Sequence, residues 1–352
     1  MSRFFTSKYD QLTPYTPGEQ PKDQQYVKLN TNESPYPPSQ RAVEKAREAA
    51  QTLQLYSDPE CRLLTTKAAE TFGVAPNEML FTNGSDEILN FAFMAFCDAT
   101  HPAIFPDITY GFYPVFAKLN GIPFEEIPLN EDFTINVADY IGQHKTIFIA
   151  NPNAPTGLAL PLSQIEAIVK SNPDSVVVID EAYVDFGAES AVSLIHTYDN
   201  LLVTQTFSKS RSMAGARLGV GFACKELIRD LNTIKYSTNP YNVNRMTMAA
   251  GYGALEDEDY FKENCQQIIN TRAWTTEQLR ALRFTVINSA ANFVFAKHPT
   301  VAGKELYLQL KERGILVRHF DKNKLRDFNR ITIGSTEQMR ILMDTLKQLL
   351  EG

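Results

Sequence analysis

The chain has 352 residues, of which 43% are hydrophobic and 21% charged, an ordinary globular balance that allows a large core and two domains. Its net charge of -7 argues against a nucleic-acid partner, because a phosphate backbone needs a basic surface. The four cysteines fit neither zinc-site nor disulfide-framework spacing, and the five histidines are scattered, so we expect reduced thiols and no metal.

The amino-terminal stretch lacks the apolar core of a signal peptide, and no apolar run reaches the length of a membrane span. These features predict a cytoplasmic protein without a membrane partner. Residues 1–37 are polar and proline-rich, and we expect an arm there rather than a packed unit. Helices are predicted at 39–54 and 62–72, where helix-forming residues occur without glycine or proline, and Gly73 ends the second.

Between residues 79 and 222, short apolar runs alternate with helical segments. Strands are predicted at 79–82, 103–105, 146–150, 176–179, 201–203 and 218–222, and helices at 88–97 and 161–171. This alternation predicts a mainly parallel sheet with helices on both faces, which is the α/β class. Helices at 225–236 and 245–254 complete a large domain, predicted to span residues 38–255.

The pattern changes after residue 255. A long charged helix is predicted at 258–281, and a further helix and short strands follow it. The strands are expected at 284–287, 292–296, 315–318 and 330–334, the helix at 303–313, and a last helix ends the chain. These elements predict a smaller α+β domain at 256–352, against which the arm at 1–37 packs.

Chemically distinctive side chains follow two of the predicted strands. Asp180 comes directly after the strand at 176–179, and Tyr183 lies three residues beyond it. The strand at 201–203 leads to Thr206, Ser208 and Lys209, and Arg217 follows eight residues after the lysine. Because ligands of open α/β sheets bind outside the carboxyl ends of the strands, we expect these groups to meet at one site.

This set of groups suits pyridoxal phosphate. The amine of Lys209 can bond covalently to its aldehyde, and the carboxylate of Asp180 can keep its pyridine nitrogen protonated. Tyr183 can donate to the ring hydroxyl, while Arg217, Ser208 and Thr206 offer donors for the phosphate. Each residue alone is more often a cap, a solvated loop or a surface cation, so the prediction depends on their ordered combination.

In that order, these residues resemble the cofactor segments of fold-type I pyridoxal-phosphate-dependent aminotransferases. The resemblance implies that the turn formed by Gly84, Ser85 and Asp86 holds the cofactor phosphate, at the amino end of a helix where N–H groups and the helix dipole favour an anion. It also implies that Tyr110 stacks on the pyridine ring. Tyr56 matches a tyrosine that crosses a homodimer interface to the neighbouring cofactor phosphate. Alone, these residues would be an N-cap and core aromatics.

One loop departs from the family pattern. The segment from Asn151 to Gly157 resembles the family sequence Asn-Pro-Asn-Asn-Pro-Thr-Gly, but Ala154 replaces the asparagine before the second proline. In the family that asparagine commonly donates to the ring hydroxyl, which alanine cannot do. We expect Asn153 to supply the contact, with Asn151 or Tyr183 alone as the alternatives.

Almost the whole chain resembles histidinol-phosphate aminotransferases. Tyr15, Arg318 and Arg330 match the residues that hold the anionic tail of the substrate in that family. Two guanidinium groups and a phenol suit a phosphate dianion better than a single carboxylate, because phosphate offers more acceptor oxygens. The resemblance implies transfer of an amino group between L-histidinol phosphate and 2-oxoglutarate, giving L-glutamate, in histidine biosynthesis.

Three alternatives stay open at this point. The same scaffold supports aromatic amino-acid aminotransferases and a phosphothreonine decarboxylase, which also binds an amine and a phosphate. A regulatory module that binds the cofactor without catalysis is the third. Such modules usually carry an appended DNA-binding domain, and this chain has no spare basic segment for one.

Overall fold

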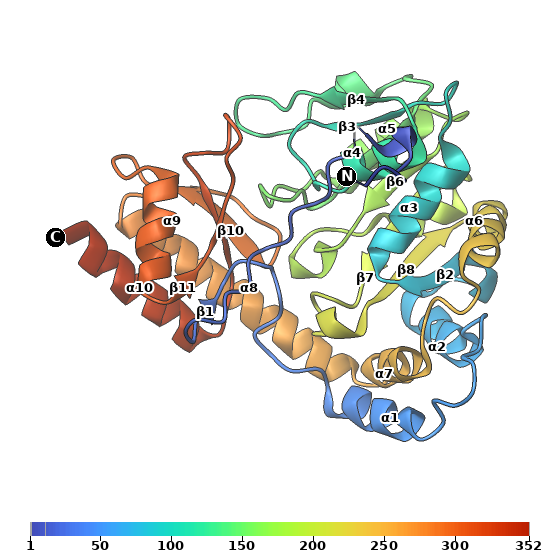
Figure 1. Ribbon diagram of the computed structural model, residues 1–352, viewed down its shortest axis with the longest axis horizontal. Helices are drawn as coiled ribbons and strands as arrows, with labels where there is room; N and C mark the ends of the chain where they lie inside the picture. The colour runs from blue at the N-terminus through green and yellow to red at the C-terminus, as the bar shows by residue number, and fades with distance from the viewer. Residues whose placement is uncertain (1, 11, 352) are drawn as a thin grey trace.

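The central layer of the protein is a seven-stranded sheet, seen in a computed structural model that describes residues 2–10 and 12–351 (Figure 1). The strand order is β2-β8-β7-β6-β5-β3-β4. Strands β7, β6, β5, β3 and β4 are parallel, whereas β8 is antiparallel to both of its neighbours. The bounds are β2 Met79–Asn83, β3 Ala103–Pro106, β4 Phe124–Ile127, β5 Thr146–Ala150, β6 Val177–Asp180, β7 Leu201–Thr206 and β8 Leu218–Ala223. The predicted mainly parallel α/β sheet is confirmed.

Both faces of this sheet are buried, because successive side chains of a strand point to opposite sides. In β5, Ile147 and Ile149 belong to one core, and Phe148 and Ala150 belong to the other. The first core is closed by α1 (Gln40–Ala50), α2 (Arg62–Phe72), α5 (Leu162–Ser171) and α7 (Arg245–Leu255). The second is closed by α3 (Ser85–Phe96), α4 (Tyr113–Asn120) and α6 (Lys225–Thr238). Burial on both faces explains why these strands read as continuous apolar runs.

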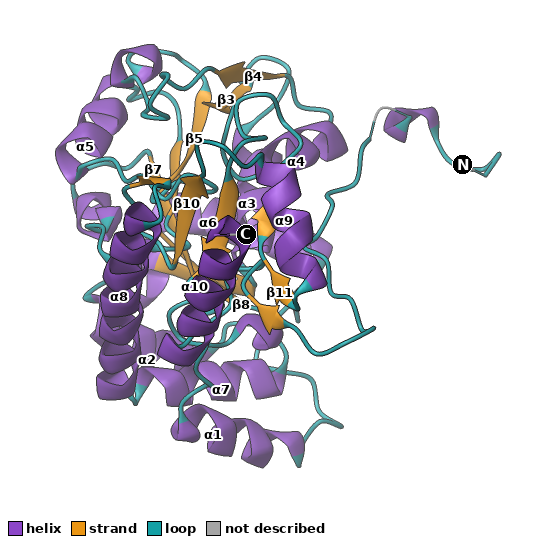
Figure 2. Cartoon of the chain, turned by 90° about the vertical axis from the view of Figure 1, so that its left-hand side faces the viewer, coloured by secondary structure: helices purple, strands orange, loops and turns teal. Residues whose placement is uncertain are grey.

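A second, antiparallel sheet follows in the order β12-β13-β10-β9. Its strands are β9 Thr285–Ile287, β10 Phe293–Lys297, β12 Arg318–His319 and β13 Asn329–Thr332. It packs with α8 (Glu258–Ala281), α9 (Gly303–Glu312) and α10 (Thr336–Glu351), and Figure 2 shows α8 and α10 side by side. The change of pattern after residue 255 therefore corresponds to a separate sheet and core, while the exact domain boundaries stay a prediction.

The amino-terminal segment is only partly an extended arm. Residues 2–10 are almost all exposed and extend away from the body (Figure 2). In contrast, β1 (Val27–Lys28) pairs in parallel with β11 (Ile315–Leu316), and Leu29 is fully buried in the core of the smaller sheet. This part of the arm therefore packs with the smaller sheet, because the apolar Leu29 within the polar segment reaches the core of that sheet.

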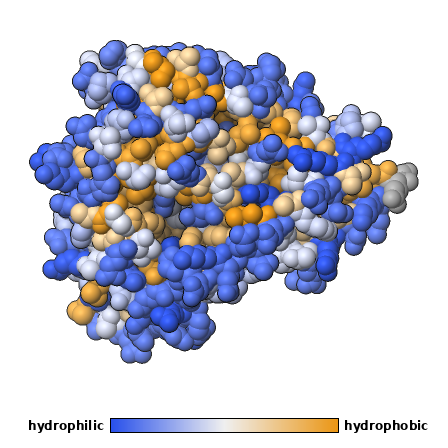
Figure 3. Space-filling view, turned by 180° about the vertical axis from the view of Figure 1, so that it is seen from behind, coloured by the Kyte–Doolittle hydropathy of each residue, from blue (hydrophilic) through white to orange (hydrophobic). Residues whose placement is uncertain are grey.

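Several predicted boundaries differ from the structure. Helix α1 ends at Ala50 instead of residue 54, and the run predicted as one strand at 315–318 is split into β11 and β12. Neither α4 nor β4 was predicted. Strand β4 has the sequence Phe-Glu-Glu-Ile and lies at the sheet edge, where charged side chains can face solvent. The molecular surface is mixed, with hydrophobic side chains toward the top and centre of the face in Figure 3 and hydrophilic ones along its lower edge.

Candidate active site

A cavity opens where the carboxyl ends of β6 and β7 meet the amino end of α3. Nine of the residues predicted for cofactor binding line it: Ser85, Asp86, Tyr110, Asp180, Tyr183, Thr206, Ser208, Lys209 and Arg217. The parallel strands bring these groups together, since they end at the same edge of the sheet. Most of the residues that line this cavity were therefore predicted from the sequence.

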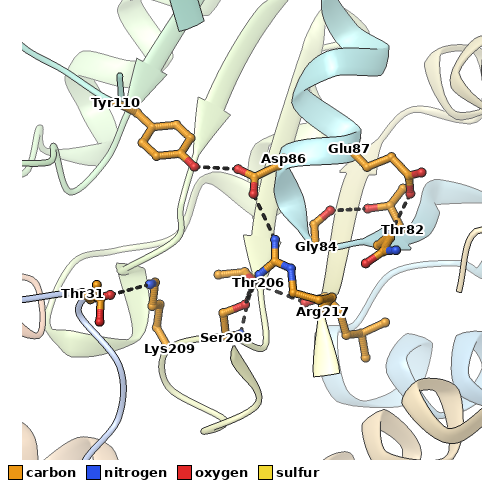
Figure 4. Close-up of polar contacts among 12 residues, drawn as sticks. Thr31, Thr82, Gly84, Asp86, Glu87, Tyr110, Thr206, Ser208, Lys209 and Arg217 are labelled. Atoms are coloured by element: carbon orange, nitrogen blue, oxygen red, sulfur yellow. Dashed lines mark hydrogen bonds and ion pairs between the residues drawn. The ribbon is translucent and has the colours of Figure 1, made fainter. Parts of the chain in front are cut away.

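Lys209 lies in the turn after β7, with its amine directed toward the cavity (Figure 4). Its Nζ donates to the main-chain oxygen of Thr31 at 3.4 Å and lies 5.7 Å from the centre of the Tyr183 ring. In the part of the chain that the structure describes, no carboxylate forms an ion pair with it. The amine is thus held loosely by one carbonyl and can reach a ligand.

Asp180 is the last residue of β6 and is only 4% exposed. Burial raises the pKa of its carboxyl group to about 6, although the hydroxyl of Tyr113 opposes this shift by donating to it. The donors are Tyr113 Oη, 3.0 Å from Oδ2, and Thr204 Oγ1, 3.2 Å from Oδ1. Within the described residues no cation pairs with Asp180. A buried carboxylate in this state favours a ligand that brings a cationic N–H group.

The opposite end of the cavity is built to hold an anion. Gly84 precedes α3 with a φ of +77°, and a Cβ atom there would lie 2.4 Å from Nη2 of Arg217. The guanidinium therefore lies against the glycine backbone in a space that any other residue would fill. Arg217 also donates to Ser208 Oγ at 3.4 Å, and Ser208 lies 2.9 Å from Thr206 Oγ1. Helix N–H groups, a guanidinium and two hydroxyls converge here (Figure 4).

Asp86 links this end of the cavity to the aromatic wall. Its carboxylate pairs with Arg217 at 3.0 Å and accepts a hydrogen bond from the Tyr110 hydroxyl at 2.7 Å (Figure 4). Burial and the nearby Asp86 charge both raise the pKa of Tyr110, so the phenol stays neutral. The side chain of Asp86 thus fixes Arg217 and Tyr110, which leaves its main-chain N–H as its contribution to the anion seat.

These features together fit pyridoxal phosphate. The cradle at Gly84 and Arg217 suits a phosphate, the buried carboxyl of Asp180 suits a protonated pyridine nitrogen, and the amine of Lys209 suits an aldehyde. Among the described residues, no group of three or more His, Cys, Asp or Glu side chains is placed to hold a metal ion. No described helix is both long and apolar enough to cross a membrane.

A second cavity adjoins the first and shares Tyr110, Ala154, Tyr183 and Lys209 with it. Tyr15, Arg318 and Arg330, the three residues predicted to bind substrate, line this cavity. The structure therefore brings residues from the two ends of the chain to the amine of Lys209. Tyr15 reaches Arg318 and Arg330, which are far from it in sequence, because the arm passes beside the smaller sheet.

Arg330 is prepared for an anion. Its Nη2 donates to the main-chain oxygen of Asn30 at 3.1 Å, whereas its buried Nε has no partner. Burial lowers the pKa of the guanidinium, and the rings of Phe293 and Phe320 lie 5.3 and 5.7 Å from its carbon. No described carboxylate pairs with Arg330 or Arg318. Two cations without counter-charges therefore face one cavity.

Tyr15 is 37% exposed and is fixed by aromatic contacts. Its ring stacks on Phe112 at 4.2 Å and lies 6.4 Å from Tyr110. It also packs against the space beside Gly111, where a Cβ atom would come within 3.4 Å of it. Its phenol can therefore share an anion with the arginines of the same cavity.

Three residues predicted for cofactor binding are not among those that line the cavity: Gly84, whose backbone lies against Arg217, Asn153 and Tyr56. Asn153 is turned away, because its amide donates both protons, to Ile108 O at 3.0 Å and to Thr156 Oγ1 at 3.1 Å. It is not among the lining residues, so the expectation that it replaces the missing contact at Ala154 has no support here. Tyr56 is 78% exposed and stacks on Tyr241 at 4.5 Å, on the outside of the chain.

Three polar partners of the site were not predicted from the sequence: Tyr113, Thr204 and Asn32. Tyr113 lies in a segment rich in aromatic residues, so its role could not be told from its type. Only the helical periodicity of α4 would have indicated that its side chain faces the sheet. Thr204 lies on β7, one position from residues that face the other core. Asn32 is 151 residues from Tyr183, whose hydroxyl accepts a hydrogen bond from its amide at 3.0 Å. No local signal could have identified that pair.

Comparison with known proteins adds a family and a set of relatives. The family model "Aminotransferase class I and II" matches residues 24–346. Histidinol-phosphate aminotransferase of Marinomonas sp. is 52% identical over 99% of this chain and 100% of its own length. The enzyme of the same name from Brachyspira hyodysenteriae is 47% identical over the full length of both chains.

Solved structures agree in fold. The histidinol-phosphate aminotransferase of Sinorhizobium meliloti, solved in complex with pyridoxal-5'-phosphate, has a TM-score of 0.90 at 22% identity and covers 100% of this chain and 98% of its own. A putative histidinol-phosphate aminotransferase of Erwinia carotovora atroseptica has a TM-score of 0.85 at 25% identity, over 93% and 96% of the two chains. The arrangement of both sheets is thus shared with experimental structures.

Proposed function

Since the chain belongs to the class I and II aminotransferase family, we propose that it transfers an amino group between L-histidinol phosphate and 2-oxoglutarate with pyridoxal phosphate as its cofactor. The products are imidazole-acetol phosphate and L-glutamate, and the reaction is a step of histidine biosynthesis. The observation that carries this assignment is the second cavity, where Tyr15, Arg318 and Arg330 face the amine of Lys209. These donors suit a substrate with an amine at one end and a phosphate at the other.

The residues of the first cavity hold the cofactor. Gly84, Ser85 and Asp86 offer main-chain N–H groups to its phosphate, and Thr206, Ser208 and Arg217 complete that seat. Tyr110 would stack on its ring, Tyr183 would donate to its ring hydroxyl and Asp180 would pair with its ring nitrogen. When bound, pyridoxal phosphate supplies a ring that withdraws electrons from the carbon bearing the amino group.

Two residues perform the proton chemistry. Asp180 holds a proton on the ring nitrogen by ion pairing, which keeps the ring electron-withdrawing. Lys209 would hold the aldehyde of the cofactor through its amine. Once a substrate amine has taken its place, the amine of Lys209 would be the acid–base group that moves a proton between the substrate carbon and the cofactor carbon. Tyr183 stabilises charge on the ring oxygen. Arg318, Arg330 and Tyr15 hold the substrate phosphate, which fixes the reacting carbon near Lys209.

The same assignment includes a homodimer in the cytoplasm. Exposed apolar side chains gather on connected segments around α1, α2 and α7, and we call them the α1–α2 surface: Leu53, Leu55, Tyr56, Leu63, Tyr241 and Met246. A second copy packed there would cover them and would place Tyr56 near its cofactor phosphate. The described cysteines are all free thiols, which suits a reducing compartment. We also propose the division into an arm at 1–37, a large domain at 38–255 and a small domain at 256–352.

The decisive experiment compares amino donors with purified protein and 2-oxoglutarate. We expect glutamate to form fastest with histidinol phosphate, and more slowly with phenylalanine, which lacks the phosphate that the two arginines bind. A higher catalytic efficiency with phenylalanine would assign the protein to the aromatic aminotransferases. Release of carbon dioxide from phosphothreonine, without glutamate formation from any donor, would assign it to the decarboxylases.

A further inference from the structure

Asn32 joins the amino-terminal arm to the smaller sheet. It is 1% exposed and has a φ of 55°, a left-handed conformation that asparagine tolerates better than most residues. Its main-chain N–H donates to Thr332 Oγ1 at 2.9 Å, and its carbonyl accepts from Asn292 Nδ2 at 3.0 Å. The backbone of Asn32 is therefore fixed by two residues that lie about 260 to 300 positions later in the chain.

The orientation of the Asn32 amide follows from these contacts. Because the Thr332 hydroxyl oxygen accepts from the main chain, its proton is free to donate to Asn32 Oδ1, 3.0 Å away. The oxygen end of the amide is thus identified, and Nδ2 faces the hydroxyl of Tyr183 at 3.0 Å. An amide N–H can only donate, so the Tyr183 oxygen is the acceptor of this bond.

This bond decides where the hydroxyl proton of Tyr183 can go. With its oxygen accepting from Asn32, the O–H group must point elsewhere, and no described residue accepts a hydrogen bond from it. Tyr183 lines both cavities, beside Lys209. A donor that already accepts one hydrogen bond is also polarised toward giving a stronger one.

Ala154 makes this arrangement necessary. It packs with Ala291, Phe293 and Tyr183 in a small apolar cluster and cannot donate through its side chain. The neighbouring Asn153 donates both of its amide protons to other groups, Ile108 O and Thr156 Oγ1. Tyr183 is therefore the side-chain donor that remains on this side of the cavity, and its direction depends on Asn32.

We propose that Asn32 is a positioning residue that aims the hydroxyl proton of Tyr183 at the ring hydroxyl of pyridoxal phosphate, in place of the amide that Ala154 lacks. This inference rests on the proposed function, since it assumes that the cofactor occupies the first cavity. The adjacent Thr31 carbonyl accepts from Lys209, so two consecutive arm residues contact two cofactor-binding side chains. The arm is then part of the cofactor site rather than only a strap on the smaller sheet.

The test measures the pH midpoint of the visible absorbance of the bound cofactor. Asn32→Asp keeps the size of the side chain and its acceptor for Thr332, but replaces the donor with a carboxylate to which Tyr183 would turn. The ring oxygen of the cofactor then loses a hydrogen-bond donor. It attracts more strongly the proton on the nitrogen that joins Lys209 to the cofactor, so we expect the pH midpoint to rise by about one unit. Asn32→Gly, which suits the φ of 55° and adds no charge, should shift it in the same direction by less.

A double-mutant cycle separates positioning from simple charge. Tyr183→Phe should raise the midpoint by itself, and Asn32→Asp should add nothing in that background, because the two residues act through one hydrogen bond. The charged groups near Tyr183 are Lys209 and Arg330, with Glu33 acting through Lys209. A shift that persists in the Tyr183→Phe background would be a charge effect on these groups and would overturn the proposal.

Leu29→Ala is the control for loosening of the arm, since the Leu29 side chain is buried in the core of the smaller sheet and has no polar role. It should lower the melting temperature and leave the midpoint unchanged; an equal shift in this variant would overturn the proposal. An unshifted midpoint in both Asn32 variants, with normal absorbance of the wild type, would overturn this inference alone. Absence of any cofactor absorbance in the wild type would instead overturn the proposed function.

Discussion

Asp180 and Arg330 are charged side chains placed where no described residue of opposite charge meets them. Burial raises the pKa of Asp180 to about 6 and lowers the pKa of Arg330, so each charge is less favourable here than in water. The fold holds them at a cost in free energy that a ligand of the opposite charge offsets. A cationic ring nitrogen at Asp180 and a phosphate at Arg330 would do so, which is why these residues indicate function.

Lys209→Ala should abolish both the covalent bond to the cofactor and the proton transfer. We expect turnover to fall by about 10²- to 10⁴-fold from the loss of general acid–base catalysis alone. Borohydride reduction followed by peptide mapping should label residue 209 in the wild type and nothing in the variant.

Lys322→Ala is the matched control, because Lys322 is another lysine on the wall of the substrate cavity. This variant should keep the label at residue 209 and most of the turnover number. Near-normal turnover of Lys209→Ala, or a wild-type label at another lysine, would contradict the assignment of the catalytic amine.

Glu181→Gln should change how stability depends on pH. Glu181 is fully enclosed and accepts from Ser190, Gln205 and the Ala191 main chain, and its burial raises the pKa of the carboxyl group from 4.5 to about 7. Between these two values the folded protein holds a proton that the unfolded chain has released, so raising the pH favours unfolding. The wild type should lose up to about 3 kcal/mol across this window, and the variant should lack that contribution.

The measurement is urea unfolding of both holoenzymes at pH 5, 6, 7 and 8. Buried Asp180 and Asp185 are present in both proteins, so the difference between the two curves reports Glu181. A constant difference in unfolding free energy across this range would mean that Glu181 is already ionised at pH 5 in the folded protein.

At the scale of elements, the phosphate seat depends on how closely β8 approaches the start of α3. Gly219 lies on β8 where a Cβ atom would be 2.3 Å from the Ser85 nitrogen and 2.4 Å from the Gly84 carbonyl carbon. Both are backbone atoms, which cannot move aside as the end of a flexible side chain can. The free N–H groups of α3 are therefore positioned by a residue of another element that has no side chain.

Gly219→Ala should displace the amino end of α3 and weaken cofactor binding by about tenfold or more, since a shift worth 1.4 kcal/mol already gives that factor. Titration of the apoprotein with pyridoxal phosphate, followed by absorbance, measures the change. Gly221→Ala is the control on the same strand, where the new Cβ would meet Ile88 Cγ2 at 3.2 Å. Equal affinities of the two variants would show that the close approach of Gly219 to the Gly84–Ser85 backbone does not shape the seat, because Gly221 meets α3 only through the Ile88 side chain.

At the scale of the whole molecule, the α1–α2 surface is an apolar surface that a single chain leaves exposed to solvent. Helices α1, α2 and α7 lie together along one edge in Figure 1, and Leu63 on α2 is 80% exposed. Single exposed apolar residues are ordinary, whereas several on connected segments indicate an interface. The proposed homodimer accounts for them.

Leu63→Asp should shift the sedimentation of the protein from dimer to monomer, because the new charge would have to be buried in the interface. Activity should fall in parallel, since Tyr56 would no longer reach the neighbouring site. Ile341→Asp, at an exposed position of α10 far from this surface in sequence, should leave the dimer intact. A wild type that sediments as a monomer would disprove the proposed assembly.

The sequence by itself determined the central sheet and most of the cofactor cavity. Its strands are buried on both faces, so they stand out as continuous apolar runs, and the residues that follow them must meet at one edge. Strand β4 was not predicted because it lies at the edge of the sheet and carries two charged residues. It therefore lacks the continuous apolar run that marks the other strands. The local sequence pattern was therefore enough to predict strands that are fully buried, and also to predict which residues meet at the end of parallel strands.

Only the tertiary structure decided which donors face the first cavity. The choice between Asn153 and Tyr183 depends on hydrogen bonds to Ile108 and Asn32, which come from other parts of the chain. A side chain with several donors and acceptors turns toward whichever partners the fold supplies, and sequence spacing carries no information about them. The direction of a single proton at Tyr183 thus rests on how the arm docks on the smaller sheet.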